Sequence, residues 1–98
     1  MNKTAVLQQV AVALSPLCAA LLRGEDSRAL PTVEVLGFHF RAVRLSAPRG
    51  VPGPAWRAHF QCQDTDPATG YRLGIDGSAS VVASCIFRRL ARDGRLAT

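Results

Sequence analysis

The hydrophobic residues of segment 3–23 have the spacing of an amphipathic helix. They recur at alternating steps of three and four residues and so form one stripe at ~100° per residue; these positions are Leu7, Val10, Leu14, Leu17 and Leu21. Pro16 lies on the opposite, polar face and removes one backbone hydrogen bond. The pattern predicts either a single helix that bends at Pro16, or a second short helix capped by Ser15. Gly24 ends the element.

Residues 31–45 predict a strand whose alternation changes phase once. Val33 and Val35 share one parity, whereas the later apolar positions share the other, namely Leu36, Phe38, Phe40 and Ala42. The shift falls beside Gly37 and indicates a β-bulge there. Two short strands with a break between them would produce the same pattern.

Two further strands follow a long connection. Residues 46–54 hold three prolines and two glycines and cannot continue a ladder. Residues 55–63 alternate strictly, with Trp56, Ala58, Phe60 and Cys62 on one parity and Arg57, His59, Gln61 and Gln63 on the other. Residues 64–70 are rich in turn formers, and the alternation of Tyr71, Leu73 and Ile75 predicts a third strand.

The last element is predicted to be a helix over residues 78–93. Ser78 is the expected N-cap, and the apolar face comprises Ala79, Val82, Cys85, Ile86 and Leu90. Three arginines in the last turns, Arg88, Arg89 and Arg92, complement the helix dipole. Gly94 then ends the helix.

These elements predict one α+β domain spanning residues 1–98. The expected order is α-β-β-β-α, a three-stranded antiparallel meander with both helices packed on one face. The predicted core comprises Leu7, Leu14, Leu17, Phe38, Phe40, Trp56, Phe60, Leu73, Ile75, Val82 and Ile86.

Composition agrees with a folded domain and bears on its location. The chain has 98 residues, 48% of them hydrophobic and 19% charged, which fits a single hydrophobic core. No apolar run is expected to reach the roughly 20 residues of a membrane span, and Gln8 and Gln9 disfavour a signal peptide. Three widely spaced cysteines, Cys18, Cys62 and Cys85, suit free buried thiols. We therefore expect a cytoplasmic protein without membrane contact.

The formal net charge is +5, and only one of the twelve basic residues, Lys3, is a lysine. A GC-rich genome favours arginine codons, and anion recognition favours the planar guanidinium group. Composition leaves both explanations open. The positive charge favours anionic partners under either explanation.

Candidate chemistry is sparse, so the chain is not expected to be an enzyme. The histidines are predicted on the solvent face of the sheet and the cysteines on its core face, which disfavours a metal site or a Cys–His nucleophile. Asp64 and Asp66 share one turn, where we expect them to cap the backbone. Residues 74–80 predict a turn followed by an N-cap rather than a phosphate-binding loop. No cofactor is expected.

The pattern with functional content is a basic sheet face. Arg41, Arg57, His59 and Arg72 are predicted to project from the side opposite the core, and Arg49 lies in the 46–54 connection. The acidic Asp64 and Asp76 are expected at strand ends rather than between the basic residues. These five residues are the predicted partner-binding residues, although a solvated face would show the same pattern.

The element order resembles that of double-stranded RNA-binding domains. Gly53-Pro54 before the second strand, Phe60 within it and Gly77-Ser78 at the last helix match in position. That family carries a lysine cluster at the start of the last helix, where this chain has Ala79, Ser80 and Val81. The resemblance therefore implies a shared architecture and does not carry over the phosphate-binding residues.

We therefore expect a small, non-catalytic protein-binding regulator, inhibitor or adaptor, of the kind that phages and mobile elements encode. Its partner would present an acidic surface or be a nucleic-acid complex, and a sheet edge could pair in a homodimer. The alternative is a nucleic-acid-binding module. The scarcity of lysine disfavours duplex RNA, and the core parity of the strand aromatics disfavours base stacking.

Overall fold

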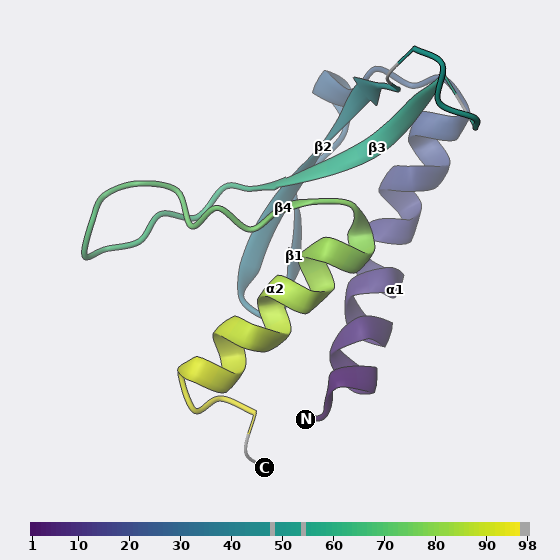
Figure 1. Cartoon of the computed structure of the whole chain (residues 1–98). Helices are drawn as coiled ribbons and strands as arrows, with labels where there is room; N and C mark the ends of the chain where they lie inside the picture. The colour runs from purple at the N-terminus through teal and green to yellow at the C-terminus, as the bar shows by residue number, and fades with distance from the viewer. Residues whose placement is uncertain (48, 54, 97–98) are drawn as a thin grey trace.

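The computed structural model describes residues 1–47, 49–53 and 55–96 (Figure 1). Within them lie α1 (Lys3–Leu22), a 3₁₀ helix η1 (Ser27–Ala29), β1 (Val33–Val35), β2 (Phe38–Ser46), β3 (Trp56–Cys62), β4 (Asp76–Gly77) and α2 (Ala79–Arg92). All neighbouring strands are antiparallel, in the order β1-β2-β3-β4. The α+β class and the helix–meander–helix order are confirmed, with four strands rather than the expected three.

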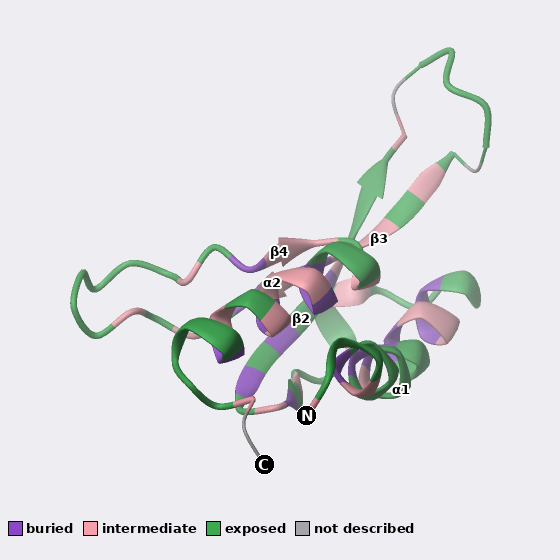
Figure 2. Cartoon of the chain, turned by 60° about the horizontal axis from the view of Figure 1, so that its bottom comes forward, coloured by how far each residue is buried: buried purple, intermediate pink, exposed green. Residues whose placement is uncertain are grey.

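The core lies between one face of the sheet and the two helices. Along β2, Phe38, Phe40 and Ala42 are buried while the residues between them are exposed, so only one face of the strand is covered (Figure 2). α1 contributes Val6, Val10, Leu14, Leu17, Ala20 and Leu21, and α2 contributes Val82, Ala83, Ile86 and Leu90.

Most of the predicted core is confirmed. Leu7 is the exception: it remains 38% exposed at the edge of the α1 stripe. Trp56 and Leu73 are half-buried and pack against the core, whereas the other eight predicted residues are buried. Both helices therefore use the faces that their spacing predicts.

The additional strand comes from a chain reversal at Leu36 and Gly37. Both residues have positive φ angles, 54° and 87°, as a two-residue hairpin turn of the primed type requires. Val35 pairs with Phe38 and Val33 with Phe40, which brings all four side chains to the same face. The expected bulge is therefore wrong, and the alternative of two short strands is confirmed.

The predicted strand over residues 71–75 is not regular. Tyr71 is 78% exposed, and only Asp76 and Gly77 pair with β3 as a strand. Residues 64–73 form an irregular arm, held by Leu73 N–H donating to Asp64 O (3.1 Å) and Asp66 N–H donating to Tyr71 O (2.7 Å). Gly74 has φ +74°, which interrupts the extended conformation.

α1 is one continuous helix, so the alternative of a second helix capped by Ser15 is wrong. Pro16 lies inside it on the exposed face, where the missing backbone bond does not disturb core packing. The helix begins at an N-cap that the sequence pattern missed: Asn2 accepts a hydrogen bond from Ala5 N–H (2.9 Å).

By length and composition, α1 could also cross a membrane. Its 20 residues include an 18-residue window of mean hydropathy 1.9, one third of which is buried. The expectation that no run approaches membrane-span length is therefore wrong, because alanine, valine and leucine outweigh the two glutamines. In this fold the helix packs as a core element through Val10, Leu14 and Leu21.

The junction between β4 and α2 requires glycine at position 77. Ser78 caps α2 as predicted, with Val81 N–H donating to its hydroxyl (3.4 Å). Gly77 has φ +140°, and a Cβ there would lie 2.9 Å from a Val81 methyl group. The sheet thus continues into α2 through a conformation that L-residues rarely adopt.

We expect Gly77→Ala to lower the free energy of unfolding by about 2 kcal/mol, because the strained backbone and the contact with Val81 act together. Gly74→Ala is the matched control: φ is also positive, but its Cβ would meet nothing within 4 Å, so about 1 kcal/mol is expected. Urea denaturation measures both. Equal losses for the two variants would contradict the role assigned to the Val81 contact.

Candidate functional site

One face of the sheet is not covered by α1 or α2, and its side chains form the candidate site. The short η1 segment borders this face, where Ser27 and Leu30 line a hollow together with Arg41 and Val43. The residues of β2 and β3 whose parity is opposite to the core define this open face: His39, Arg41, Val43, Leu45, Arg57, His59 and Gln61. All of them are exposed or half-buried. Because α1 and α2 both pack on the other side, this face is free to contact a partner.

The half of the open face nearer the 46–55 connection is basic with an apolar centre. Val43 pairs with His59 and Leu45 with Arg57, so each basic side chain lies beside an aliphatic one. Among the described residues, Arg57 and His59 make no side-chain hydrogen bond or ion pair. Their polar groups therefore remain available to an acidic surface.

Arg41 lies at the inner boundary of this basic half. Its Nε donates to Gln61 Oε1 across the strands (3.1 Å). It also lines a hollow of about 250 Å³ with Arg28, Thr32 and Gln63. The hydrogen bond orients the guanidinium group, and its remaining donors stay exposed.

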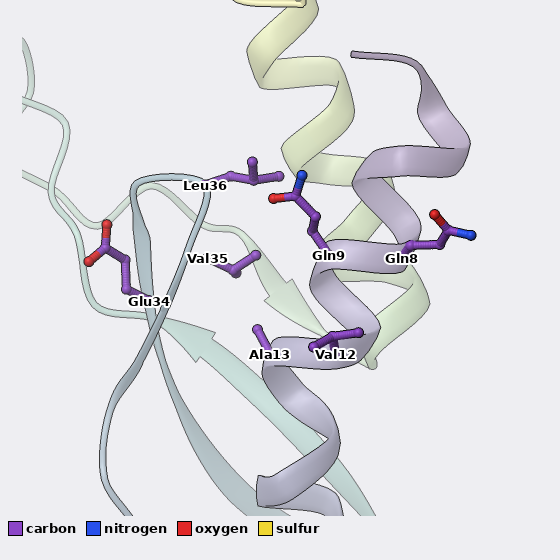
Figure 3. A pocket seen from close by; sticks show the side chains of 7 residues that line it. All are labelled: Gln8, Gln9, Val12, Ala13, Glu34, Val35 and Leu36. Atoms are coloured by element: carbon purple, nitrogen blue, oxygen red, sulfur yellow. The ribbon is translucent and has the colours of Figure 1, made fainter.

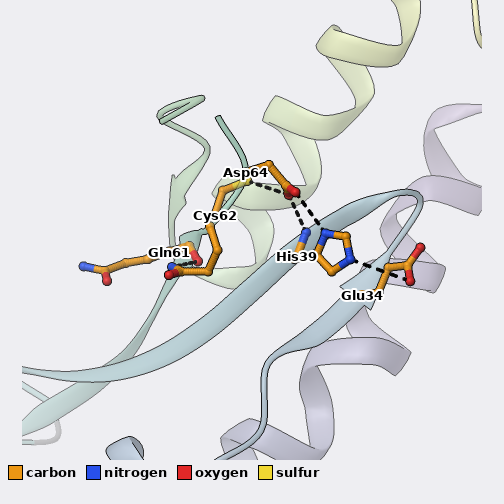
Figure 4. A network of polar contacts seen from close by, with 6 residues as sticks. Glu34, His39, Gln61, Cys62 and Asp64 are labelled. Atoms are coloured by element: carbon orange, nitrogen blue, oxygen red, sulfur yellow. Dashed lines mark hydrogen bonds and ion pairs between the residues drawn. The ribbon is translucent and has the colours of Figure 1, made fainter. Parts of the chain in front are cut away.

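The other end of the open face is acidic. His39 lies between two carboxylates: its Nδ1 donates to Asp64 Oδ1 (2.9 Å), and its Nε2 lies 3.8 Å from Glu34 Oε2 (Figure 4). The backbone N–H of His39 also donates to Asp64 Oδ2 (2.7 Å). Charges at this end are thus paired within the molecule, unlike those around Arg57.

Asp64 acts across the sheet rather than within its own turn. Only Asp66 caps locally, by accepting from Ala68 N–H (2.9 Å), so the expectation for the pair is half confirmed. Burial by itself would raise the pKa of Asp64, but hydrogen bonds from His39 and Cys62 hold that pKa below its usual value. The carboxylate therefore stabilises the folded state as an anion.

Cys62 and His39 both contact Asp64, contrary to the expectation that their opposite faces keep them apart. The Cys62 thiol donates to Asp64 Oδ2 (3.4 Å) at the strand end, and burial raises the pKa of this thiol. A protonated, buried thiol is a poor nucleophile. In the described part of the chain, no group of three or more His, Cys, Asp or Glu side chains could hold a metal ion.

The remaining predicted residues lie apart from the basic half. Arg72 is at the acidic end, where its Nη2 lies 3.9 Å from Asp76 Oδ2 and its Nη1 donates to Cys62 O (3.4 Å). Arg49 is exposed in the 46–55 connection. Asp64 and Asp76 lie at strand ends, as expected, and Asp76 pairs with Arg72 there.

Arg44, which was not among the predicted site residues, joins the sheet to α1. Its guanidinium carbon lies 4.3 Å from the centroid of the Trp56 ring, and its Nη2 donates to Leu21 O (2.7 Å) at the end of α1. The alternation of β2 could have revealed this role, because Arg44 is at a position whose side chain points to the same side as those of Phe40 and Ala42. A cation at that position satisfies a helix carbonyl and stacks on the indole.

A hollow of about 400 Å³ lies between α1 and the β1–β2 turn (Figure 3). Its lining includes Gln9, Val12, Ala13 and Leu36, and Glu34 is its only titratable side chain. Within this lining Glu34 has no titratable neighbour, and its contact with His39, at 3.8 Å, lies on the open face instead.

Comparisons with protein-family models, curated proteins and solved structures found no match. The expected resemblance to double-stranded RNA-binding domains therefore rests on element order and a few local positions alone. At its points of likeness, Ser78 caps α2 and Phe60 is buried, while Pro54 lies outside the described residues. Ala79 and Ser80 begin α2 without any lysine.

We expect Asp64→Asn to lower the free energy of unfolding by about 1–2 kcal/mol at neutral pH, because the three hydrogen bonds that the carboxylate accepts, two from His39 and one from Cys62, are weakened. The pKa of Asp64 is lower in the folded state, so its contribution is complete above the unfolded pKa of about 4 and disappears as the pH falls through the folded pKa. Denaturant titrations of both proteins across this range measure the difference. A difference that stays constant down to the lowest pH would contradict the assignment.

Proposed function

We propose that this protein is a small, non-catalytic binding module, a regulator, inhibitor or adaptor, that docks on an acidic surface of another protein. The observation that carries the proposal is the basic half of the open face. There, Arg57 and His59 lack side-chain partners among the described residues and flank the aliphatic Val43 and Leu45. Unpaired guanidinium and imidazole groups around an apolar centre are the composition of a protein-recognition patch.

Two features favour a protein over a nucleic acid. Among the described strand residues, the aromatic side chains lie on the core parity, with Phe40 and Phe60 buried and Trp56 beneath Arg44. In the strands that the structure describes, the open face thus presents no Phe, Tyr or Trp ring on which a base could stack. Its acidic end, with Glu34 and Asp64, would repel a phosphate backbone running along the sheet.

The 46–55 connection extends the proposed surface. It joins the ends of β2 and β3 beyond the helices and carries the exposed Arg49 and Val51 (Figures 1 and 2). A partner seated on Arg57 and Leu45 would lie next to it. We include Arg49 in the binding surface for this reason, and leave out Arg72 because Asp76 pairs with it.

The test is affinity capture from nuclease-treated lysate of the producing cells with wild-type protein and two charge-matched variants. We expect Arg41→Glu/Arg57→Glu to reduce recovery of the specific partner about tenfold, since both reversed charges face it. Arg88→Glu/Arg92→Glu makes the same charge change on α2, away from the open face, and should leave recovery unchanged.

Equal losses with the two variants would contradict a specific docking face and indicate attraction by net charge alone. Binding to labelled duplex or single-stranded nucleic acid provides the second readout. Affinity that falls steeply with salt and is lost in Arg41→Glu/Arg57→Glu would instead support the nucleic-acid alternative.

A further inference from the structure

The backbone of β3 has an unpaired edge outside the sheet core. The ladder between β2 and β3 includes the bonds from Gln63 N–H to His39 O (2.8 Å) and from Ala47 N–H to Ala55 O (2.9 Å). These two bonds fix which residue pairs of the ladder are hydrogen-bonded, so the odd-numbered residues of β3 bond to β2. The N–H and C=O groups of the even-numbered residues point away from β2, towards the β4 side.

β4 covers only the inner part of that edge. Phe60 pairs with Gly77, and Cys62 N–H donates to Ile75 O (3.2 Å). The strand ends at Gly77, where the chain turns into α2. The outward backbone groups of Trp56 and Ala58 consequently have no strand partner among the described residues, and two donors and two acceptors remain available.

A hollow of about 280 Å³ lies beside this free edge on the helix side. Cys18, Leu22, Trp56 and Ala58 line it together with Arg57. Leu22 is 76% exposed at its rim, and burial raises the pKa of the Cys18 thiol, which therefore stays neutral. The hollow has the size and lining to accept one aliphatic side chain.

The two faces beside the free edge differ in chemistry. On the helix side lies the apolar hollow, and on the open-face side lie Arg57 and His59. Successive side chains of a strand point to opposite faces. A strand placed beside β3 would therefore meet both environments if its apolar and acidic residues alternate.

We propose that an extended segment of the partner adds to the sheet as a strand beside residues 56–59 of β3, with alternating apolar and acidic side chains. This inference rests on the proposed function and names the form of the partner segment. Main-chain hydrogen bonds to Trp56 and Ala58 supply affinity, and the hollow and Arg57 supply specificity. A second copy of this chain is the poorer occupant, because edge-to-edge pairing would bring Arg57 close to its own equivalent.

The experiment compares two labelled eight-residue peptides, one of alternating valine and glutamate and one with the same residues in two blocks. Both carry the same charge, so only alternation separates them. We expect fluorescence anisotropy to show roughly tenfold tighter binding of the alternating peptide by the wild-type protein. Equal affinity for the two peptides would overturn the proposal.

Proline substitutions locate the edge. Ala58→Pro removes an outward N–H without breaking a bond to β2, and should abolish the preference for the alternating peptide. Ser46→Pro is the matched control, because Ser46 also lies at a position that does not bond across the ladder and its N–H points to the opposite edge. Loss of the preference in both variants, or in neither, would overturn the assignment to β3.

A second variant keeps the test valid if Ala58→Pro does not fold. Leu22→Asp changes an exposed residue at the rim of the hollow. Its added negative charge lowers the affinity of both peptides equally, because the two peptides carry the same charge. The carboxylate at the rim should also hinder an apolar side chain from entering the hollow, and so reduce the ratio of the affinities of the alternating and block peptides about tenfold. An unchanged ratio would overturn the role of the hollow.

Affinity capture separates this inference from the proposed function. Recovery that depends on Arg41 and Arg57 but is unchanged by Ala58→Pro would overturn strand addition and leave the docking face intact. Recovery that is unaffected by all of these substitutions would overturn both.

Discussion

The structure depends on a core that is only one layer thick. Two helices and one small sheet supply just enough apolar surface to cover one sheet face, and α1 and α2 both use theirs on the side of Phe40 and Phe60. The alternating positions on the other side therefore remain uncovered. The pleat of the strands, rather than any single residue, decides which side chains a partner can reach.

Charge is distributed along that open face in two distinct ways. Near β1 and β4 the ionic groups are paired with one another, as Asp64 is with His39 and Asp76 with Arg72. Such pairs hold the strand ends together and leave little charge for a ligand. Near the 46–55 connection the basic groups have aliphatic neighbours instead, which is the environment in which an incoming carboxylate would gain most.

The sequence allowed the elements with strong local periodicity to be predicted, and failed where distant segments decide the conformation. The spacing along α1, the alternation of β3 and the Ser78 cap are local and were predicted correctly. The reversal at Leu36 was ambiguous because leucine rarely adopts positive φ. The contacts of Asp64 with His39 and of Arg44 with Leu21 join residues more than twenty positions apart. No short-range sequence pattern predicts such contacts.

The fold also brings the two ends of the described chain together. The amino group of Met1 donates to Leu96 O, at the end of the molecule opposite the 46–55 connection (Figure 1). The two ends of the described chain are therefore close enough to be joined without moving a helix or strand. A circularly permuted chain, joined between these ends and opened among the exposed residues 49–53, would retain every helix and strand pairing described.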